Sequence, residues 1–213
     1  MATHPGLRER KKQQTRLVIA ETARRLFVER GFDPVTVADV AREADVSIGT
    51  VFNYFPTKED LFYSGMELFE ARLIDAVRSR PAGEPVLATV RRVVLEGLPR
   101  LATGEAVDVI ATAARVVASS RSLQAREREI VARYTEDLAA LLAEETGRSA
   151  GDVEAAAVAA ALMGLQRALV AHVHASVLAG RRGGKLGAGV RSEAERAFAR
   201  LEAGLRDYGV KRT

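Results

Sequence analysis

Hydrophobic residues recur at helical spacing along most of the chain, and no stretch shows the alternating pattern typical of a β-strand. The first periodic segment predicts a helix from Glu9 or Arg10 to Arg30, with Gly31 as its C-terminal cap. Beyond a Pro- and Gly-containing break at 81–85, five more helices are predicted, over 85–102, 105–119, 122–146, 152–180 and 190–208. With the helices described below, the expected total is about nine and the fold class is all-α.

Residues 36–60 predict two short helices joined by a tight turn, followed by the start of a longer helix that runs to about residue 80. Thr36 is a suitable N-cap, and Asp39 lies three positions on, where a capping-box acid belongs. Ala44–Val46 is long enough only for a turn, after which Ser47 caps the second helix and Thr57 caps the third. Two short helices bent against each other in this way predict a helix-turn-helix.

The second short helix is expected to show polar groups to solvent and apolar groups to the core. Its expected outward residues are Gly49, Thr50, Asn53 and Tyr54, which offer hydrogen-bonding groups and a close backbone approach for a nucleic acid. Val51 and Phe55 are expected to point inward. Ile48 fits two interpretations: an inward stripe with Val51, Phe52 and Phe55, or contact with a thymine methyl group.

The run from Gly31 to Phe62, GFDPVTVADVAREADVSIGTVFNYFPTKEDLF, resembles the DNA-binding region of the TetR family of bacterial transcription regulators. The characteristic residues are Gly49, Thr50, Val51, Phe52, Tyr54, Phe55 and Lys58. The motifs cover about residues 13–65, and the remainder resembles the family only in length and helical character. The resemblance implies that these residues bind DNA: Thr15, Arg16, Thr36, Ser47, Ile48, Gly49, Thr50, Asn53, Tyr54 and Lys58. Ala38 and Ile48 depart from the family's usual polar or basic residues, so the operator sequence is not predicted.

Charge is concentrated at the N-terminus. Residues 1–16 contain five basic side chains against Glu9, which accounts for the whole net charge of +4. A basic segment next to a DNA-binding module favours contacts with the phosphate backbone. The predicted domains are a basic arm without fixed structure over 1–9, a helix-turn-helix domain over 10–60, and a helical ligand-binding and dimerisation domain over 61–213.

The last two predicted helices suit contact with a second subunit. Residues 153–179 are mostly Ala, Val and Leu, and a helix that is apolar nearly all round must be buried on several sides. A symmetric four-helix contact in a homodimer is predicted, as in the resembling family, with an internal hairpin of a monomer as the alternative. The predicted interface residues are Leu162, Leu165, Leu169, Val173, Phe198, Leu201 and Leu205.

The resemblance further implies a small-molecule pocket in the C-terminal bundle. Because this region is rich in aliphatic residues and poor in aromatic ones, an elongated apolar effector is expected. Gln166 and Arg167 interrupt an apolar segment and need polar partners, which either the effector or the second subunit would supply. The predicted lining residues are Phe69, Tyr134, Met163, Gln166 and Arg167.

The sequence lacks the residues that a metal site or a phosphate-binding loop requires. The chain has no Cys, and His172 and His174 lie two apart, where they cannot chelate one metal from one helix face, so no metal or cofactor is predicted. The Gly- and Arg-rich run at 180–187 fails the spacing of a phosphate-binding loop and is expected to be a flexible connector. No apolar run approaches the roughly 18 residues of a membrane span, and no signal-peptide pattern opens the chain.

The sequence therefore predicts a cytoplasmic, homodimeric regulator that is not an enzyme. It would act as a repressor, bind double-stranded DNA at a palindromic operator, and be released by a small-molecule effector. One alternative is a DNA-binding regulator whose bundle only dimerises or recruits a partner protein. The other is a helical enzyme or scaffold on the same fold, for which no catalytic constellation is found.

Overall fold

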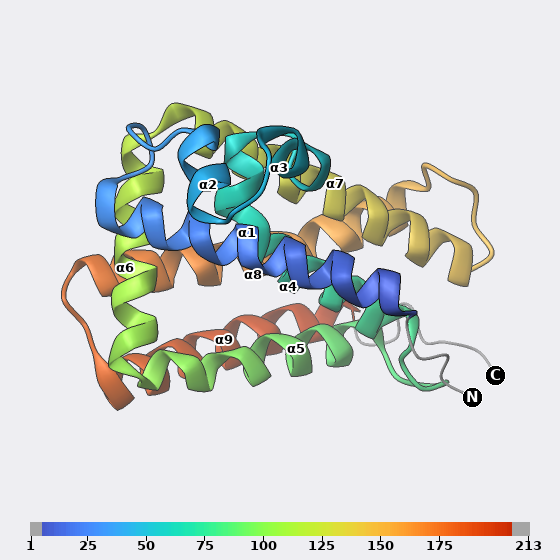
Figure 1. Cartoon of the computed structure of the whole chain (residues 1–213). Helices are drawn as coiled ribbons and strands as arrows, with labels where there is room; N and C mark the ends of the chain where they lie inside the picture. The colour runs from blue at the N-terminus through green and yellow to red at the C-terminus, as the bar shows by residue number, and fades with distance from the viewer. Residues whose placement is uncertain (1–5, 206–213) are drawn as a thin grey trace. The chain divides into compact units, whose positions relative to one another are not determined.

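A computed structural model describes residues 6–205, except for the side chains of residues 7, 9, 100, 102, 105 and 205. Within this range all regular structure is helical, which confirms the predicted all-α class (Figure 1). The elements are α1 (Leu7–Arg30), α2 (Val37–Glu43), α3 (Ile48–Tyr54), α4 (Lys58–Arg78), α5 (Val86–Gly97), a 3-10 helix η1 (Leu98–Ala102), α6 (Gly104–Ser119), α7 (Arg121–Glu145), α8 (Val153–Leu178) and α9 (Gly183–Leu205).

The chain divides into two compact units, Met1–Glu67 and Leu68–Thr213. The division falls inside α4, seven residues beyond the domain boundary that the sequence predicts at residue 60, so this helix contributes to both units. We call them the N-terminal unit and the C-terminal unit, and describe each separately.

The N-terminal unit is built around one face of α1 and a cluster of aromatic rings. Ile19, Ala23 and Leu26 are fully buried. At the end of α1, Gly31 has a φ of 84°, a left-handed value that glycine adopts without strain. This turn directs the chain back so that Phe32 packs against Phe27, with ring centroids 5.1 Å apart.

The predicted caps of the three helices that follow are all present. The Thr36 hydroxyl accepts a hydrogen bond from the Asp39 backbone N–H (3.1 Å), and the Asp39 carboxylate accepts one from the Thr36 backbone N–H (3.0 Å). Ser47 caps α3 by accepting from the Thr50 N–H at 3.0 Å. The Thr57 hydroxyl likewise accepts from the backbone N–H three residues on, at 3.1 Å. These bonds satisfy backbone donors that a helix start leaves unpaired, so each short helix begins where the sequence predicts.

The C-terminal unit packs around α8. The main core cluster unites residues of α4, α5, α7, α8 and α9, and Figure 1 shows α5 and α9 running side by side in the bundle. A smaller cluster joins η1, α6, α8 and α9. Because α8 is apolar on nearly every side, it can pack against several neighbours at once.

Three predictions for the C-terminal unit are wrong. The helix expected over 85–102 ends at Gly97 and continues as η1, and the connector expected over 180–187 is helical from Gly183. An 18-residue window of α8, with mean hydropathy 1.5, is long and apolar enough to span a membrane by composition, contrary to the statement that no such run exists. A core helix of a helical bundle meets the same criterion, and one side of α8 is packed in that core.

Most of the predicted interface residues lie inside the chain's own core. Leu162 is fully buried, and Leu165, Leu169 and Phe198 are buried in the same cluster, so none of these four is free to contact a second subunit. The remaining predicted positions divide into two partly buried residues that pack against the core, Val173 and Leu201, and one side chain outside the described part, Leu205. The largest aliphatic side chains of α8 and α9 are needed to close the bundle itself, which the one-dimensional pattern could not distinguish from an interface.

Candidate nucleic-acid interface

Helix α3 places its polar residues on the surface of the N-terminal unit, as predicted. Val51 is fully buried and Phe55 nearly so, which fixes the face that α3 turns to the core. Gly49 and Asn53 are exposed, and Tyr54 is half-buried at the flank. The helix therefore offers one amide side chain and an uncovered backbone at Gly49 to a partner outside the unit.

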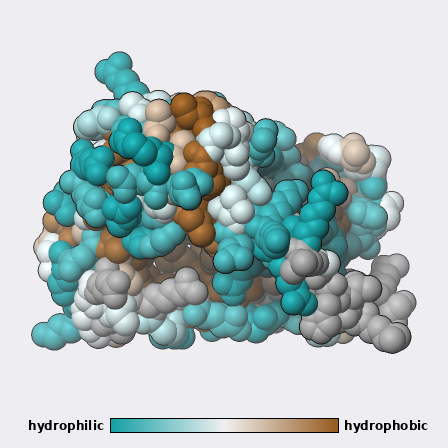
Figure 2. Space-filling view, viewed as in Figure 1, coloured by the Kyte–Doolittle hydropathy of each residue, from teal (hydrophilic) through white to brown (hydrophobic). Residues whose placement is uncertain are grey.

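Ile48 and Phe52 are also exposed, each with 46% of its surface accessible, so the interpretation of both as inward residues is wrong. A helix of seven residues has one narrow buried face, and Val51 and Phe55 already fill it. Large apolar residues are otherwise scarce on the surface. Among the described side chains, the exposed large apolar ones are Leu17, Val18, Val28, Ile48, Phe52, Leu68, Val153 and Leu178. The face drawn in Figure 2 is accordingly mostly hydrophilic, with hydrophobic residues in a limited band.

Several predicted DNA-binding side chains already have partners within the N-terminal unit. The Lys58 ammonium lies 4.2 Å from the centre of the Phe32 ring and donates a hydrogen bond to the Asp33 carbonyl at 3.2 Å. This arrangement joins the start of α4 to the loop after α1. The Thr36 hydroxyl is held by Asp39 at 2.6 Å. Lys58 and Thr36 therefore stabilise the module, in addition to any contact that they make with DNA.

The two predicted DNA-binding residues of α1, Thr15 and Arg16, also have partners within the N-terminal unit. The Arg16 guanidinium lies 5.0 Å from the centre of the Phe55 ring and 3.8 Å from a carboxylate oxygen of Glu67. The Thr15 hydroxyl donates to the Lys11 carbonyl at 3.0 Å, within its own helix. Arg16 thus links α1 to the end of α3 and to α4, which stabilises the orientation of α3.

The start of α1 is more ordered than predicted. The helix begins at Leu7, so residues 7–9 are not part of an arm without structure, whereas residues 1–5 lie outside the described part. Arg8, Lys11 and Lys12 are exposed on its first turns. A helical frame holds these charges at fixed spacing, which suits contact with a row of phosphates.

The Asp39 carboxylate of α2 remains ionised. Hydrogen bonds from the Thr36 hydroxyl, then from the Thr36 backbone N–H and from Arg42, hold the pKa of Asp39 well below its usual range. The capping box is therefore intact across the physiological pH range.

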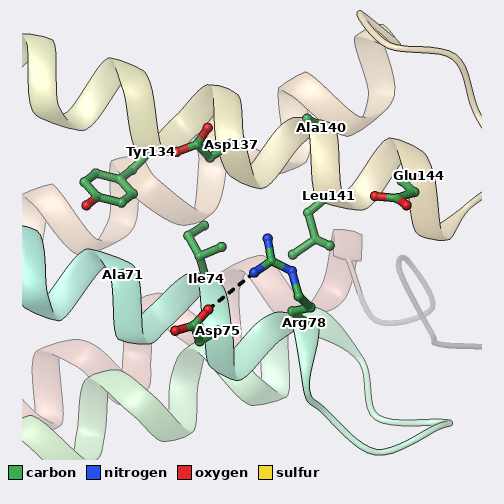
Figure 3. Close-up of a pocket in the computed structure, with 9 residues that line it drawn as sticks. All are labelled: Ala71, Ile74, Asp75, Arg78, Tyr134, Asp137, Ala140, Leu141 and Glu144. Carbon is green, nitrogen blue, oxygen red and sulfur yellow. Dashed lines mark hydrogen bonds and ion pairs between the residues drawn. The ribbon is translucent and has the colours of Figure 1, made fainter. Parts of the chain in front are cut away.

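The C-terminal unit contains a cavity of about 420 Å³ between α4 and α7 (Figure 3). Its lining mixes apolar and charged side chains, and Arg78 bridges to Asp75 at 3.4 Å. The lining residues are Ala71, Ile74, Asp75, Arg78, Tyr134, Asp137, Ala140, Leu141 and Glu144. A second cavity of about 460 Å³ lies between α5 and α9, with Leu87, Leu95 and Phe198 among its lining residues.

Of the five predicted effector-binding residues, only Tyr134 lines either of these two cavities. Met163 is buried in the main core cluster, and Phe69 packs against that cluster. Gln166 is buried on α8, whereas Arg167 is exposed, which is wrong for a pocket-lining residue. The burial of these residues depends on which face of α8 or α4 they occupy. The sequence does not determine which faces point to the core.

Glu70, the most unusual polar group of the C-terminal unit, is not among the residues predicted from the sequence. Its side chain is only 1% exposed, and neither carboxylate oxygen has a hydrogen-bond partner among the described residues. Burial raises the pKa of Glu70 to about 7. Glu70 falls on the same face of α4 as the buried Leu73 and Val77, so an acid within an apolar helical stripe was the available signal.

These observations define a helix-turn-helix protein with a separate helical bundle. Over residues 19–64 the chain matches the model of a family described as bacterial regulatory proteins, tetR family. The HTH-type transcriptional regulator TcmR of Streptomyces glaucescens is 32% identical over 101 residues, which are 47% of this chain and 45% of TcmR. The chain thus matches less than half the length of this curated relative. The predicted resemblance to the TetR family of bacterial regulatory proteins is therefore confirmed over this segment of the chain.

Solved structures extend the likeness of fold over most of the chain. A TetR-family regulator from Syntrophomonas wolfei superposes with a TM-score of 0.57 at 19% identity, covering 88% of this chain and 96% of its own. A TetR regulator from Rhodococcus sp. RHA1 gives 0.55 at 20% identity, with coverage of 90% and 98%. Both are titled as transcriptional regulators, as TcmR is named, in agreement with the prediction that the chain is not an enzyme.

Proposed function

We propose that this protein is a homodimeric, DNA-binding transcriptional repressor of the cytoplasm. The proposal rests on one observation. The capped helix α3 presents Gly49 and Asn53 to solvent, and it lies within the segment that matches the family model. In this proposal α3 enters the major groove, where Asn pairs well with adenine edges. Arg8, Lys11 and Lys12 of α1 bind phosphates and make the affinity fall with salt.

The dimer uses the sides of α8 and α9 that the core leaves uncovered. On α8 the exposed residues recur every three or four positions and are mostly small: Ala156, Ala160, Gly164, Ala168, Ala171 and Ala175. On α9 the exposed positions Ala188, Ser192, Ala199 and Ala203 follow a similar course. Small side chains allow two helices to approach closely, and the same patch on each subunit makes a two-fold contact. A two-fold dimer predicts a palindromic operator.

A small, largely apolar effector binds in the C-terminal unit and releases the DNA. The buried carboxyl group of Glu70 supports this part of the proposal, since a buried polar group without a partner is rare and is frequently found at a functional site. The effector must bind the DNA-free conformation a few kcal/mol more tightly than the DNA-bound one, because equal affinity would leave the equilibrium between the two conformations unchanged.

Selection of genomic DNA fragments from the source organism by the purified full-length protein tests the proposal. At near-physiological salt we expect enrichment of a palindrome, which Asn53→Ala abolishes while the dimer persists. Ser149→Ala, an exposed polar residue in a turn of the C-terminal unit, is the control and should enrich the same sequence. Failure of the wild-type protein to enrich any sequence, with and without candidate effectors, would show that it does not read DNA.

A further inference from the structure

Ile48 and Phe52 form a continuous apolar surface on α3. They lie four positions apart, which places their side chains next to each other on one face of the helix. Each is 46% exposed, although Val51, between them in sequence, is fully buried. Two large apolar side chains side by side in water indicate a surface that is covered when the protein acts.

The surroundings of this pair are polar and open. Asn53 is exposed beside Phe52, and Gly49 is exposed beside Ile48. A Cβ atom added at Gly49 would have Ser47 Oγ as its nearest neighbour, 3.8 Å away, so the helix backbone is open to close approach. A partner of this face must therefore combine apolar groups with hydrogen-bonding groups at short spacing.

The major groove of DNA has this combination. On its floor the thymine C5-methyl is the apolar group, and it lies beside the donors and acceptors of the base edges. We propose that Ile48 and Phe52 contact thymine methyl groups in each operator half-site and thereby select thymine, an inference that rests on the proposed DNA-binding function. The exposed basic residues Arg8, Lys11 and Lys12 of the same unit favour a polyanion over an apolar protein partner.

The spacing of the two side chains limits the spacing of the bases. Side chains four apart on a helix are separated by roughly 5–6 Å, and successive base pairs by about 3.4 Å. The pair therefore spans one to two base steps. Each half-site should contain two thymines within three consecutive base pairs, on either strand.

Deoxyuridine provides the test, because it differs from thymidine only by the C5-methyl group. The full-length protein first selects its operator from a randomised duplex pool, and the selected duplex is then resynthesised with single thymidines replaced by deoxyuridine. We expect affinity to fall about fourfold for each contacted methyl, from the transfer free energy of one buried carbon. Two positions per half-site should show this loss, and the remaining thymidines should not.

Variants assign the effect to the two side chains. Ile48→Ala and Phe52→Ala should each weaken binding to the thymidine operator and remove the deoxyuridine sensitivity at one position. Both residues are exposed, so circular dichroism should show an unchanged fold. The matched control is Leu17→Ala, which truncates an exposed apolar residue of α1 (59% accessible) and should keep the full sensitivity.

Three results would overturn the inference. Equal affinity for the thymidine and deoxyuridine operators would exclude methyl contacts while leaving the proposed DNA binding intact. Sensitivity that persists in the Ile48→Ala/Phe52→Ala double variant would assign the methyl contact to other residues. Loss of the dimer in that variant would show that the apolar pair contacts a second copy of the chain. Absence of binding to any duplex would instead reject the proposed function itself.

Discussion

The two units of this protein differ in how deeply their ion pairs are buried. In the N-terminal unit, short helices begin at side-chain caps such as Thr36 and Ser47, and the ion pair of Arg24 with Glu21 joins residues three positions apart. In the C-terminal unit, α7 and α8 are long, and a buried ion pair joins Arg80 to Glu145, 65 positions further on. Local interactions can be recognised in a sequence, whereas long-range burial cannot.

The exposed apolar residues of the two units also differ, in their size and in their neighbours. On α3, the N-terminal unit exposes the large apolar residues Ile48 and Phe52 next to polar ones, which suits a grooved partner with mixed chemistry. The C-terminal unit exposes a series of alanines and Gly164 along α8, which suits the close approach of another helix. An exposed apolar residue thus indicates different partners according to its size and to its neighbours.

The largest expected effect comes from filling the small-residue face of α8. A Cβ at Gly164 meets nothing within 4 Å in a single chain, so Gly164→Arg should leave the subunit folded and block the dimer. We expect a monomer in analytical ultracentrifugation and DNA affinity lower by about 100-fold or more, because two linked half-site contacts are lost. Gly97→Arg, at the exposed end of α5, has the same open surroundings and should remain dimeric. A dimeric Gly164→Arg protein would show that α8 is not the interface.

Breaking one arginine ion pair in each unit contrasts a buried pair with a solvent-exposed one. The Arg80 guanidinium is fully buried and makes two contacts with the Glu145 carboxylate, at 2.6 and 3.0 Å. Arg80→Met should lower the free energy of unfolding of the C-terminal unit by about 3–5 kcal/mol, because it leaves a partly buried carboxylate unpaired. Chemical denaturation followed by circular dichroism measures the change.

Arg25→Met is the matched control in the N-terminal unit. Arg25 pairs with Glu29 and Glu43 on the surface, where solvent screens the attraction, so its loss should leave stability unchanged within error. An Arg80→Met/Glu145→Met double variant should recover part of the lost stability, since no charge is then left buried. Equal losses for Arg25→Met and Arg80→Met would contradict the contrast between the units.

Glu70 should make the stability of the C-terminal unit depend on pH. Its pKa is raised from an ordinary value of 4.5 to about 7, so the folded state binds a proton that the unfolded state has released between these values. The contribution of Glu70 to the free energy of unfolding is therefore largest below about pH 4.5, and it is lost as the pH rises through 7. The difference is on the order of 3 kcal/mol.

Glu70→Gln keeps the shape of the side chain and removes the titration. Denaturant titrations between pH 5 and pH 8 should show the wild-type protein losing stability and the variant changing much less, with the variant the more stable at pH 8. Glu67→Gln, three positions earlier on α4, should retain the pH dependence of the wild type. An identical pH dependence in the wild type and Glu70→Gln would show that Glu70 is not the group responsible.

The smallest effect comes from removing a helix cap in each unit. Ser47→Ala should cost about 1 kcal/mol, because α3 is only two turns long and depends on its cap. DNA affinity should fall with it. Asp152 caps α8 in the same manner, through the Ala155 N–H at 2.9 Å, but core packing holds that helix. Asp152→Ala should therefore cost no more stability and leave DNA affinity unchanged, as a filter-binding assay would show.

The sequence alone locates some residues of the candidate interface, whereas others can be located only from the packing. The caps at Thr36, Ser47 and Thr57 were predicted at the right positions, because a cap and the N–H that it accepts from lie within three residues. The sequence leaves Ile48 open between an inward and an outward position and groups Phe52 with the inward stripe, because a seven-residue helix gives too few positions to fix its orientation. Only the packing of Val51 and Phe55 in three dimensions decides it.

By itself, the sequence determined the all-α class, the helix-turn-helix with its caps, and the polar residues that α3 presents, all of which depend on side chains close together in the chain. The tertiary structure decided which residues of α8 are buried in the subunit's own core, since an apolar helix has the same pattern whether its neighbour is the same chain or another. It also decided that Glu70 is buried without a partner and that Lys58 and Arg16 pack on aromatic rings. Those contacts join residues distant in sequence, and their free energies depend on burial that no local pattern encodes.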